Sequence, residues 1–175
     1  MSDLNTQRTI EVLPYNKTWP RVFQAEKQLL AKIFGDLAVS IEHIGSTSVT
    51  GLCAKPIIDI QIEVRNIQAV DDLNHQFEQL GYHAKGENGI KGRRYFQKGG
   101  NQRTHHVHVY QSGDENLLRH LAFRDYLINN PDIRDQYAKV KLLAVTQCNQ
   151  DINQYMAMKN DFIQHHEKLA LQRQK

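Results

Sequence analysis

The stretch from residue 57 to residue 64 reads Ile-Ile-Asp-Ile-Gln-Ile-Glu-Val, and it constrains the fold more than any other segment of the chain. From residue 58 on, apolar residues alternate with polar ones, which is the period of a β-strand with one buried face. The polar members, Asp59, Gln61 and Glu63, share the opposite face. The chain is therefore expected to fold around a sheet that has carboxylates on one side.

Further strands and several helices are predicted around this segment. Residues 94–98 and 104–110 form a predicted hairpin joined by Gly-Gly-Asn-Gln, and residues 39–44 form a short β-branched run. Apolar residues recur at helical spacing in five other segments, namely 18–37, 67–80, 115–129, 133–147 and the stretch after Asp151. We therefore predict an α+β fold, in which a mixed β-sheet is flanked by helices and followed by a helical C-terminal half.

Composition places the chain among ordinary globular domains. Its 175 residues are 40% hydrophobic and 23% charged, which fits one domain over residues 1–175 with a core at about residues 10–170. No apolar run approaches the roughly 20 residues that span a bilayer, and residues 1–9 are polar, unlike a signal peptide. We therefore predict a cytoplasmic protein without membrane partners.

Charge and cysteine content narrow the choice of partners. The net charge of +3 comes without a dense basic stripe, so nucleic acid is not the expected partner, whereas a small phosphorylated ligand is compatible. Cys53 and Cys148 lie far apart and have no neighbouring cysteine, which indicates two reduced thiols instead of a zinc knuckle. Nothing in the sequence indicates an oligomeric state.

A turn rich in small residues follows the run at residues 39–44. It begins with Gly45, Ser46 and Thr47, and successive backbone N–H groups in such a turn can form an anion-binding nest to which hydroxyls add donors. Gly-Ser pairs are also common turn chemistry without any ligand. Phosphate binding is thus one of two interpretations.

The acidic residues on the polar strand face are candidate metal ligands. Asp59 and Glu63 could hold Mg²⁺, which prefers oxygen ligands and often shares them with substrate phosphates. Alternatively, this face is solvated, or Asp59 pairs with Lys55 or Arg94 without a functional role.

The histidines at residues 105–108 form the third candidate. His106 and His108 lie two apart on a predicted strand and would point the same way, so they could ligate a metal or act as a general base. With Asp59 they would approximate a two-histidine, one-carboxylate set, for which Mn²⁺ or Zn²⁺ is also possible. That geometry requires the two strands to be neighbours. The alternative is that the histidines bond only to nearby groups or to water.

Positively charged side chains are available for a phosphorylated ligand. The candidates for substrate contact are Lys55, Arg94, Arg124 and Lys159. Most of the other charged residues are expected to be solvated surface.

Together these motifs resemble the GrpB family. The resemblance rests on Ile-Glu-His-Ile-Gly-Ser-Thr-Ser-Val at residues 41–49 and on Ala-Lys-Pro-Ile-Ile-Asp-Ile at residues 54–60. Arg-Thr-His-His-Val-His-Val at residues 103–109 and Phe-Arg-Asp-Tyr-Leu at residues 123–127 support it, and it covers nearly the whole chain.

The resemblance implies a nucleotidyltransferase-like fold, whose core pairs a Gly-Ser turn with carboxylates that hold two Mg²⁺ ions. On that pattern Gly45 and Ser46 match the turn and Asp59 matches the first carboxylate. Gln61 stands where the second would be, and His106 or His108 stands near the place of the third. The family also occurs fused to dephospho-CoA kinases, which implies a nucleotide or coenzyme A context.

Three functional hypotheses follow. In the first, the chain is a nucleotidyltransferase-like enzyme that acts on a small phosphorylated or nucleotide substrate with a divalent metal, with Asp59, His106 and His108 as catalytic residues. In the second, it is a non-catalytic domain of the same fold that binds a nucleotide-like ligand. In the third, it is a single-metal hydrolase that uses Asp59 and the histidines.

Overall fold

The computed structural model describes residues 9–174 and is built on one five-stranded mixed sheet. In the middle of the sheet β2 and β5 run parallel, and every other neighbouring pair is antiparallel. In spatial order the strands are β1 (Ala38–Ile44), β2 (Ile58–Val64), β5 (His105–Gln111), β4 (Arg94–Lys98) and β3 (Tyr82–Ala84).

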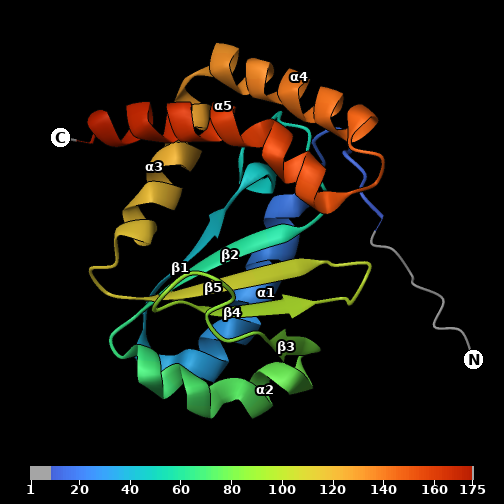
Figure 1. The fold of residues 1–175 in the computed structure, drawn as a ribbon. Helices are drawn as coiled ribbons and strands as arrows, with labels where there is room; N and C mark the ends of the chain where they lie inside the picture. The colour runs from blue at the N-terminus through green and yellow to red at the C-terminus, as the bar shows by residue number, and fades with distance from the viewer. Residues whose placement is uncertain (1–8, 175) are drawn as a thin grey trace, which may run out of the picture.

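Within the described residues five α-helices surround the sheet; the last two lie side by side as a layer across one end of it, and the third runs from the sheet toward these two (Figure 1). The first two helices are packed with the sheet in the main apolar core, which contains Phe23, Leu30 and Phe77. The helices are α1 (Trp19–Phe34), α2 (Asn74–Gln79), α3 (Glu115–Asn129), α4 (Pro131–Gln147) and α5 (Ile152–Gln172).

Local sequence signals explain where the C-terminal helices begin. Asp114 accepts a hydrogen bond from the Asn116 backbone N–H, and Asp151 accepts from the backbone N–H groups of Asn153 and Gln154, as helix N-caps do. Pro131 opens α4, where a missing N–H costs least. The predicted α+β fold with a mixed sheet and a helical C-terminal half is confirmed.

Two predicted helices differ in detail from what the structure shows. The first ends at Phe34, and residues Gly35–Leu37 continue as a 3₁₀ turn. In the second, Ile67–Leu73 is a 3₁₀ helix and only Asn74–Gln79 is α-helical. Ile67, Val70 and Leu73 recur every three residues, which is the period of a 3₁₀ helix and explains the difference.

The polar face of β2 is not simply exposed to solvent, as one interpretation of the sequence expected. Gln61 is only 2% exposed, because α3 covers this part of β2. Within residues 9–174 no helix combines the length and apolarity needed to cross a bilayer. The polar segment at residues 1–8, used above to argue against a signal peptide, lies outside the described residues.

Candidate functional site

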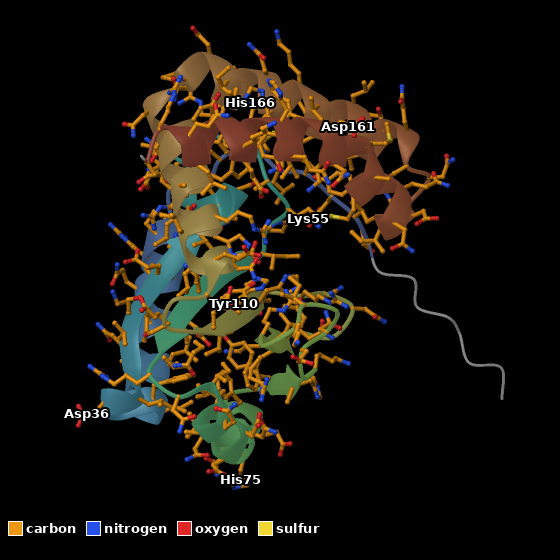
Figure 2. The ribbon with its side chains drawn as sticks, turned by 60° about the vertical axis from the view of Figure 1, so that its left-hand side comes forward. Asp36, Lys55, His75, Tyr110, Asp161 and His166 are labelled. Carbon is orange, nitrogen blue, oxygen red and sulfur yellow. The ribbon has the colours of Figure 1, made fainter. Side chains whose placement is uncertain are left out.

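A pocket of about 450 Å³ opens between the polar face of the sheet and the helices α3, α4 and α5. Figure 2 shows Lys55 between the helical layer and the sheet, at the level of this opening. The pocket brings together nine of the residues that the sequence singled out: Gly45, Ser46, Thr47, Lys55, Asp59, His106, His108, Arg124 and Lys159.

Gly45 ends β1 and brings the chain against the carboxylate of Asp59. Its φ is +73°, a conformation that L side chains rarely adopt, and an added Cβ would lie 2.7 Å from Asp59 Oδ2. The backbone then turns, with the N–H of Ser48 donating to the Gly45 carbonyl at 3.1 Å. A residue without a side chain is therefore required for the turn to reach the strand that carries Asp59.

Asp59 lies at the centre of a three-residue cluster. Its Oδ1 is 3.4 Å from His106 Nδ1 and 3.3 Å from His108 Nε2. The parallel pairing of β2 with β5 creates this proximity, because Asp59 is the register partner of His106 and Gln61 that of His108. The two strands are thus neighbours, which the set of two histidines and one carboxylate requires.

The surrounding donors determine where the imidazole protons lie. Arg93 approaches His108 Nδ1 at 3.4 Å, and a guanidinium can only donate, so His108 carries its proton on Nε2, facing Asp59. His106 Nδ1 likewise faces Asp59, which assigns the proton to that nitrogen. The buried Nε2 of His106 is left as an acceptor without a hydrogen-bond partner in the described structure.

The titration behaviour follows from burial and from these contacts. Burial raises the pKa of Asp59, but the hydrogen bonds from His106 and His108, together with their charges, outweigh it and hold the carboxyl pKa far below its ordinary value. Burial lowers the pKa of His106 despite the opposing effect of Asp59. At neutral pH the cluster therefore consists of a carboxylate and a neutral His106 that can accept a proton.

Gln61, at the position of the expected second carboxylate, does not line the pocket. Its Oε1 is bound by His120 Nδ1 at 2.8 Å, and its Nε2 donates to the Leu117 carbonyl at 3.2 Å. Gln61 thus anchors α3 to the sheet, and β2 contributes one carboxylate to the pocket, where a two-metal site needs two.

Basic side chains dominate the pocket walls. Two carboxylates, Asp59 and Glu167, line the pocket together with six basic side chains: Lys55, Arg93, Arg103, Arg124, Lys141 and Lys159. Arg124 also bonds to Glu42 at 3.0 Å and to the His43 carbonyl at 3.1 Å, which holds it beside the turn at Gly45. Such a lining favours an anionic ligand.

Two predicted site residues lie elsewhere. Arg94 is aligned with Val109 on the core side of the sheet and forms an ion pair with Asp71 at 2.7 Å, so its predicted substrate contact is not supported by its position. Glu63 faces the same way as Asp59 but lies two strand repeats further along β2, near Ser40 Oγ, and does not line the pocket.

Among the pocket side chains that were not predicted from the sequence are a histidine and a glutamate of the helices. His120 and Glu167 lie on α3 and α5, and nothing in their local sequence distinguishes them from ordinary helical residues. The apolar spacing of each helix gives the only available signal, since it indicates which side of the helix turns inward.

The pocket offers few side-chain donors for a metal ion. Within residues 9–174 no group of three or more His, Cys, Asp and Glu side chains has the arrangement of a metal site. The lone carboxylate of Asp59 beside an anion-binding wall fits a cation that completes its shell with ligand phosphate oxygens, as Mg²⁺ and Mn²⁺ do. It does not fit a zinc ion held by protein side chains alone.

Two buried histidines should make the fold sensitive to acid. Burial lowers the pKa of His43 to about 4 and that of His120 to about 3, so the unfolded chain binds protons below pH 6.5 that the folded chain does not. We expect stability to fall as the pH drops from 6.5 to 5, by on the order of 1–2 kcal/mol for each histidine. Urea unfolding at both pH values measures this loss.

A variant pair isolates the cause. His43→Gln should reduce the pH dependence by about half, because His120 remains, whereas His75→Asn, at an exposed position on α2, should leave it unchanged. Equal stability at pH 6.5 and pH 5 in the unmodified chain would contradict the assignment.

The chain is similar in sequence to several known bacterial proteins. The chain is 49% identical over 160 residues to UPF0157 protein YqkA of Bacillus subtilis, covering 91% of this chain and 47% of YqkA, so it spans about half of that relative. It is 31% identical to the glutamate-rich protein GrpB of Alkalihalophilus pseudofirmus, covering 87% of this chain and 90% of that protein. A dephospho-CoA kinase of Mycolicibacterium paratuberculosis is 29% identical over 175 residues, covering 86% of this chain and 43% of the kinase.

A solved structure shows the same fold. The crystal structure of the conserved protein GrpB from Enterococcus faecalis superposes with a TM-score of 0.90 at 44% identity, covering 93% of this chain and 98% of that one. The family model described as GrpB protein matches residues 9–169. The chain therefore belongs to the GrpB family, as its central motifs predicted.

Proposed function

We propose that the pocket binds a small phosphorylated molecule, with a nucleotide as the expected class. We further propose that Asp59, His106 and His108 act on this molecule in a transfer or hydrolysis step assisted by one divalent cation. The observation that carries the proposal is the basic character of the walls, where six Lys and Arg side chains accompany the only two carboxylates among the described lining residues.

The Asp59–His106 pair supports the chemical step. Asp59 keeps the proton of His106 on Nδ1, and the buried Nε2, which has no hydrogen-bond partner among the described residues, would accept a proton from a hydroxyl or water that enters beside it. The carboxylate then stabilises the resulting imidazolium, as in other Asp–His pairs. His108, held between Arg93 and Asp59, keeps the carboxylate oriented. In this scheme His106 is the general base and His108 is a positioning residue.

A divalent cation would be held by Asp59 and by phosphate oxygens of the ligand, and it would supply neutralisation of the phosphate charge. The turn at Gly45 and Ser46, with Thr47 beside it, would contact the same phosphate, and Arg124 and Lys159 would contact it from the helices. The expected cation is Mg²⁺, with Mn²⁺ as the alternative.

The relatives provide support of a different kind. One protein with a segment similar to this chain is a dephospho-CoA kinase, which favours a nucleotide or coenzyme A precursor as the ligand class. The Gly-Ser turn followed by Asp59 on the next strand supports a nucleotidyltransferase-like ancestry.

A second candidate function is ligand binding without catalysis. The role of Gln61 favours this candidate. Its side chain bonds to His120 and to the Leu117 carbonyl and so has a structural role, and it occupies the position where the second metal-binding carboxylate would be. The two candidates differ in whether the bound molecule is converted, so products must be sought in every binding experiment.

The test is a thermal-shift screen followed by calorimetry with ATP, ADP and dephospho-CoA, each with and without Mg²⁺. We expect binding that Mg²⁺ strengthens, and we expect Asp59→Asn to weaken the Mg²⁺-dependent affinity at least tenfold, a change of about 1.4 kcal/mol. Asp161→Asn, at an exposed position on α5, is the matched control and should bind normally.

The outcomes separate the hypotheses. Conversion of a bound compound by the unmodified chain and its loss in His106→Asn would support the enzyme. Tight binding without product would favour the second candidate. If none of the phosphorylated compounds binds, the proposed function is wrong.

A further inference from the structure

Three lysines gather at the helical end of the pocket, over two tyrosine rings. Lys159 of α5 lies over the ring of Tyr155, with 4.4 Å from Nζ to the ring centroid, and Lys55 approaches the same ring at 5.0 Å. Lys141 of α4 lies 5.0 Å from the ring centroid of Tyr137. All three lysines line the pocket.

The two helical lysines are buried without a counter-charge. Lys141 is 2% exposed and Lys159 is 6% exposed, and neither forms an ion pair with any residue in the described part of the chain. Lys141 Nζ donates to the Cys53 carbonyl at 2.9 Å, which fixes its position without neutralising it. Charging a buried amine without a partner carboxylate is costly, so two such amines facing a pocket favour an anionic ligand that would supply the missing negative charge.

The carboxylates of the pocket are not available to these lysines. Asp59 is bound by the two histidines, and Glu167 pairs with Arg119 at 3.2 Å. By contrast, Arg124 is paired with Glu42 and Asp125. Arg93 and Arg103 also form no ion pair among the described residues, but they lie beside the histidines of the Asp59 cluster, whereas Lys141 and Lys159 are a separate pair of basic groups on α4 and α5.

We propose that Lys55, Lys141 and Lys159 form a second anion subsite, so that the ligand carries two anionic groups, one beside the turn at Gly45 and one against these lysines. The inference rests on the proposed function, which supplies the first of the two groups. It narrows the ligand class to molecules with at least two phosphates, such as a diphosphate, and disfavours a simple monophosphate.

Binding at this subsite should take up a proton. Burial lowers the pKa of Lys159 to about 7, the charge of Lys55 lowers it further and Asp59 opposes the shift. Burial and the charge of Lys159 lower the pKa of Lys141 well below its ordinary value. Tyr155, whose own pKa burial raises, stays neutral. A bound anion would raise the pKa of Lys159 back toward its ordinary value. At pH 8 Lys159 would therefore take up a proton as the anion binds.

The experiment is calorimetry at pH 8 with inorganic pyrophosphate and with orthophosphate, in two buffers of different ionisation enthalpy. We expect pyrophosphate to bind at least tenfold more tightly than orthophosphate, with proton uptake by the unmodified chain. Lys159→Met should weaken pyrophosphate binding at least tenfold. Lys159→Arg, which is always charged, should keep the binding and lose the proton uptake.

Lys168→Met, an exposed lysine on the same helix, is the control and should match the unmodified chain. The arginine variant carries the test if the methionine variant does not fold. Unchanged binding in Lys159→Met, or equal proton uptake in Lys159→Arg, would overturn the subsite while leaving a single phosphate site intact. Failure of the unmodified chain to bind both phosphates and the nucleotides would instead reject the proposed function and the subsite together.

Discussion

Replacing Gly45 with alanine is expected to lower the free energy of unfolding by about 3 kcal/mol and to abolish ligand binding. Two costs add in this variant. The φ of +73° strains any L residue, and the new Cβ would meet Asp59 Oδ2 at 2.7 Å. The chain could relieve that contact only by moving Asp59 away from His106 and His108, or by opening the turn. Urea unfolding and calorimetry with ATP and Mg²⁺ measure the two effects.

Gly35 offers a matched control for this substitution. It also has a positive φ, of +52°, but an added Cβ would have no heavy atom within 4 Å. Gly35→Ala should therefore lose only about 1 kcal/mol through backbone strain and should keep the pocket intact. Similar losses in the two variants would show that the contact with Asp59 is unimportant.

The second large effect is expected from Gln61→Asp. Aspartate is one methylene shorter and loses the bonds to His120 and to the Leu117 carbonyl, and it would place a carboxyl where the side chain is 2% exposed. We expect a loss of about 3–4 kcal/mol in the free energy of unfolding and no gain in Mg²⁺ affinity. Urea unfolding at pH 7 and calorimetry with Mg²⁺ are the measurements.

Glu63→Asp provides the comparison on the same strand and face. It removes the same methylene at a half-buried position whose side chain makes only a long contact with Ser40, so it should cost less than about 1 kcal/mol. If Gln61→Asp proved stable and bound Mg²⁺ more tightly, position 61 would belong to a dormant two-metal site instead of the anchor of α3.

The central part of the fold could be predicted because it depends on local periodicity. The alternation at residues 58–64 placed Asp59 opposite the core, and the same period placed His106 and His108 together. The turn at Gly45 was recognisable from its glycine, whose conformation the structure confirms. These features need only the geometry of one strand or one turn.

The remaining features depend on packing between distant elements. The position of Arg94 depends on strand register. Arg94 is aligned with Val109, so its side chain lies on the core side of the sheet, whereas the side chain of Arg93 lines the pocket. The burial of Gln61 depends on α3, and the approach of Lys141 to Lys159 depends on how α4 meets α5. Periodicity in a single segment carries no information about such contacts.

The parallel pairing of β2 with β5 has a consequence for the order of events during folding. Asp59 lies on β2, which pairs with the preceding strand β1, and His106 lies on β5, which pairs with the preceding strand β4; both pairings are antiparallel. The pairing of β2 with β5 instead closes a long loop of chain. Closing long loops costs entropy and slows the formation of such contacts. A chain that has formed only the β1–β2 and β4–β5 pairs therefore lacks the contact between Asp59 and His106 and also lacks the basic pocket walls. We expect Asp59 and His106 to meet late in folding.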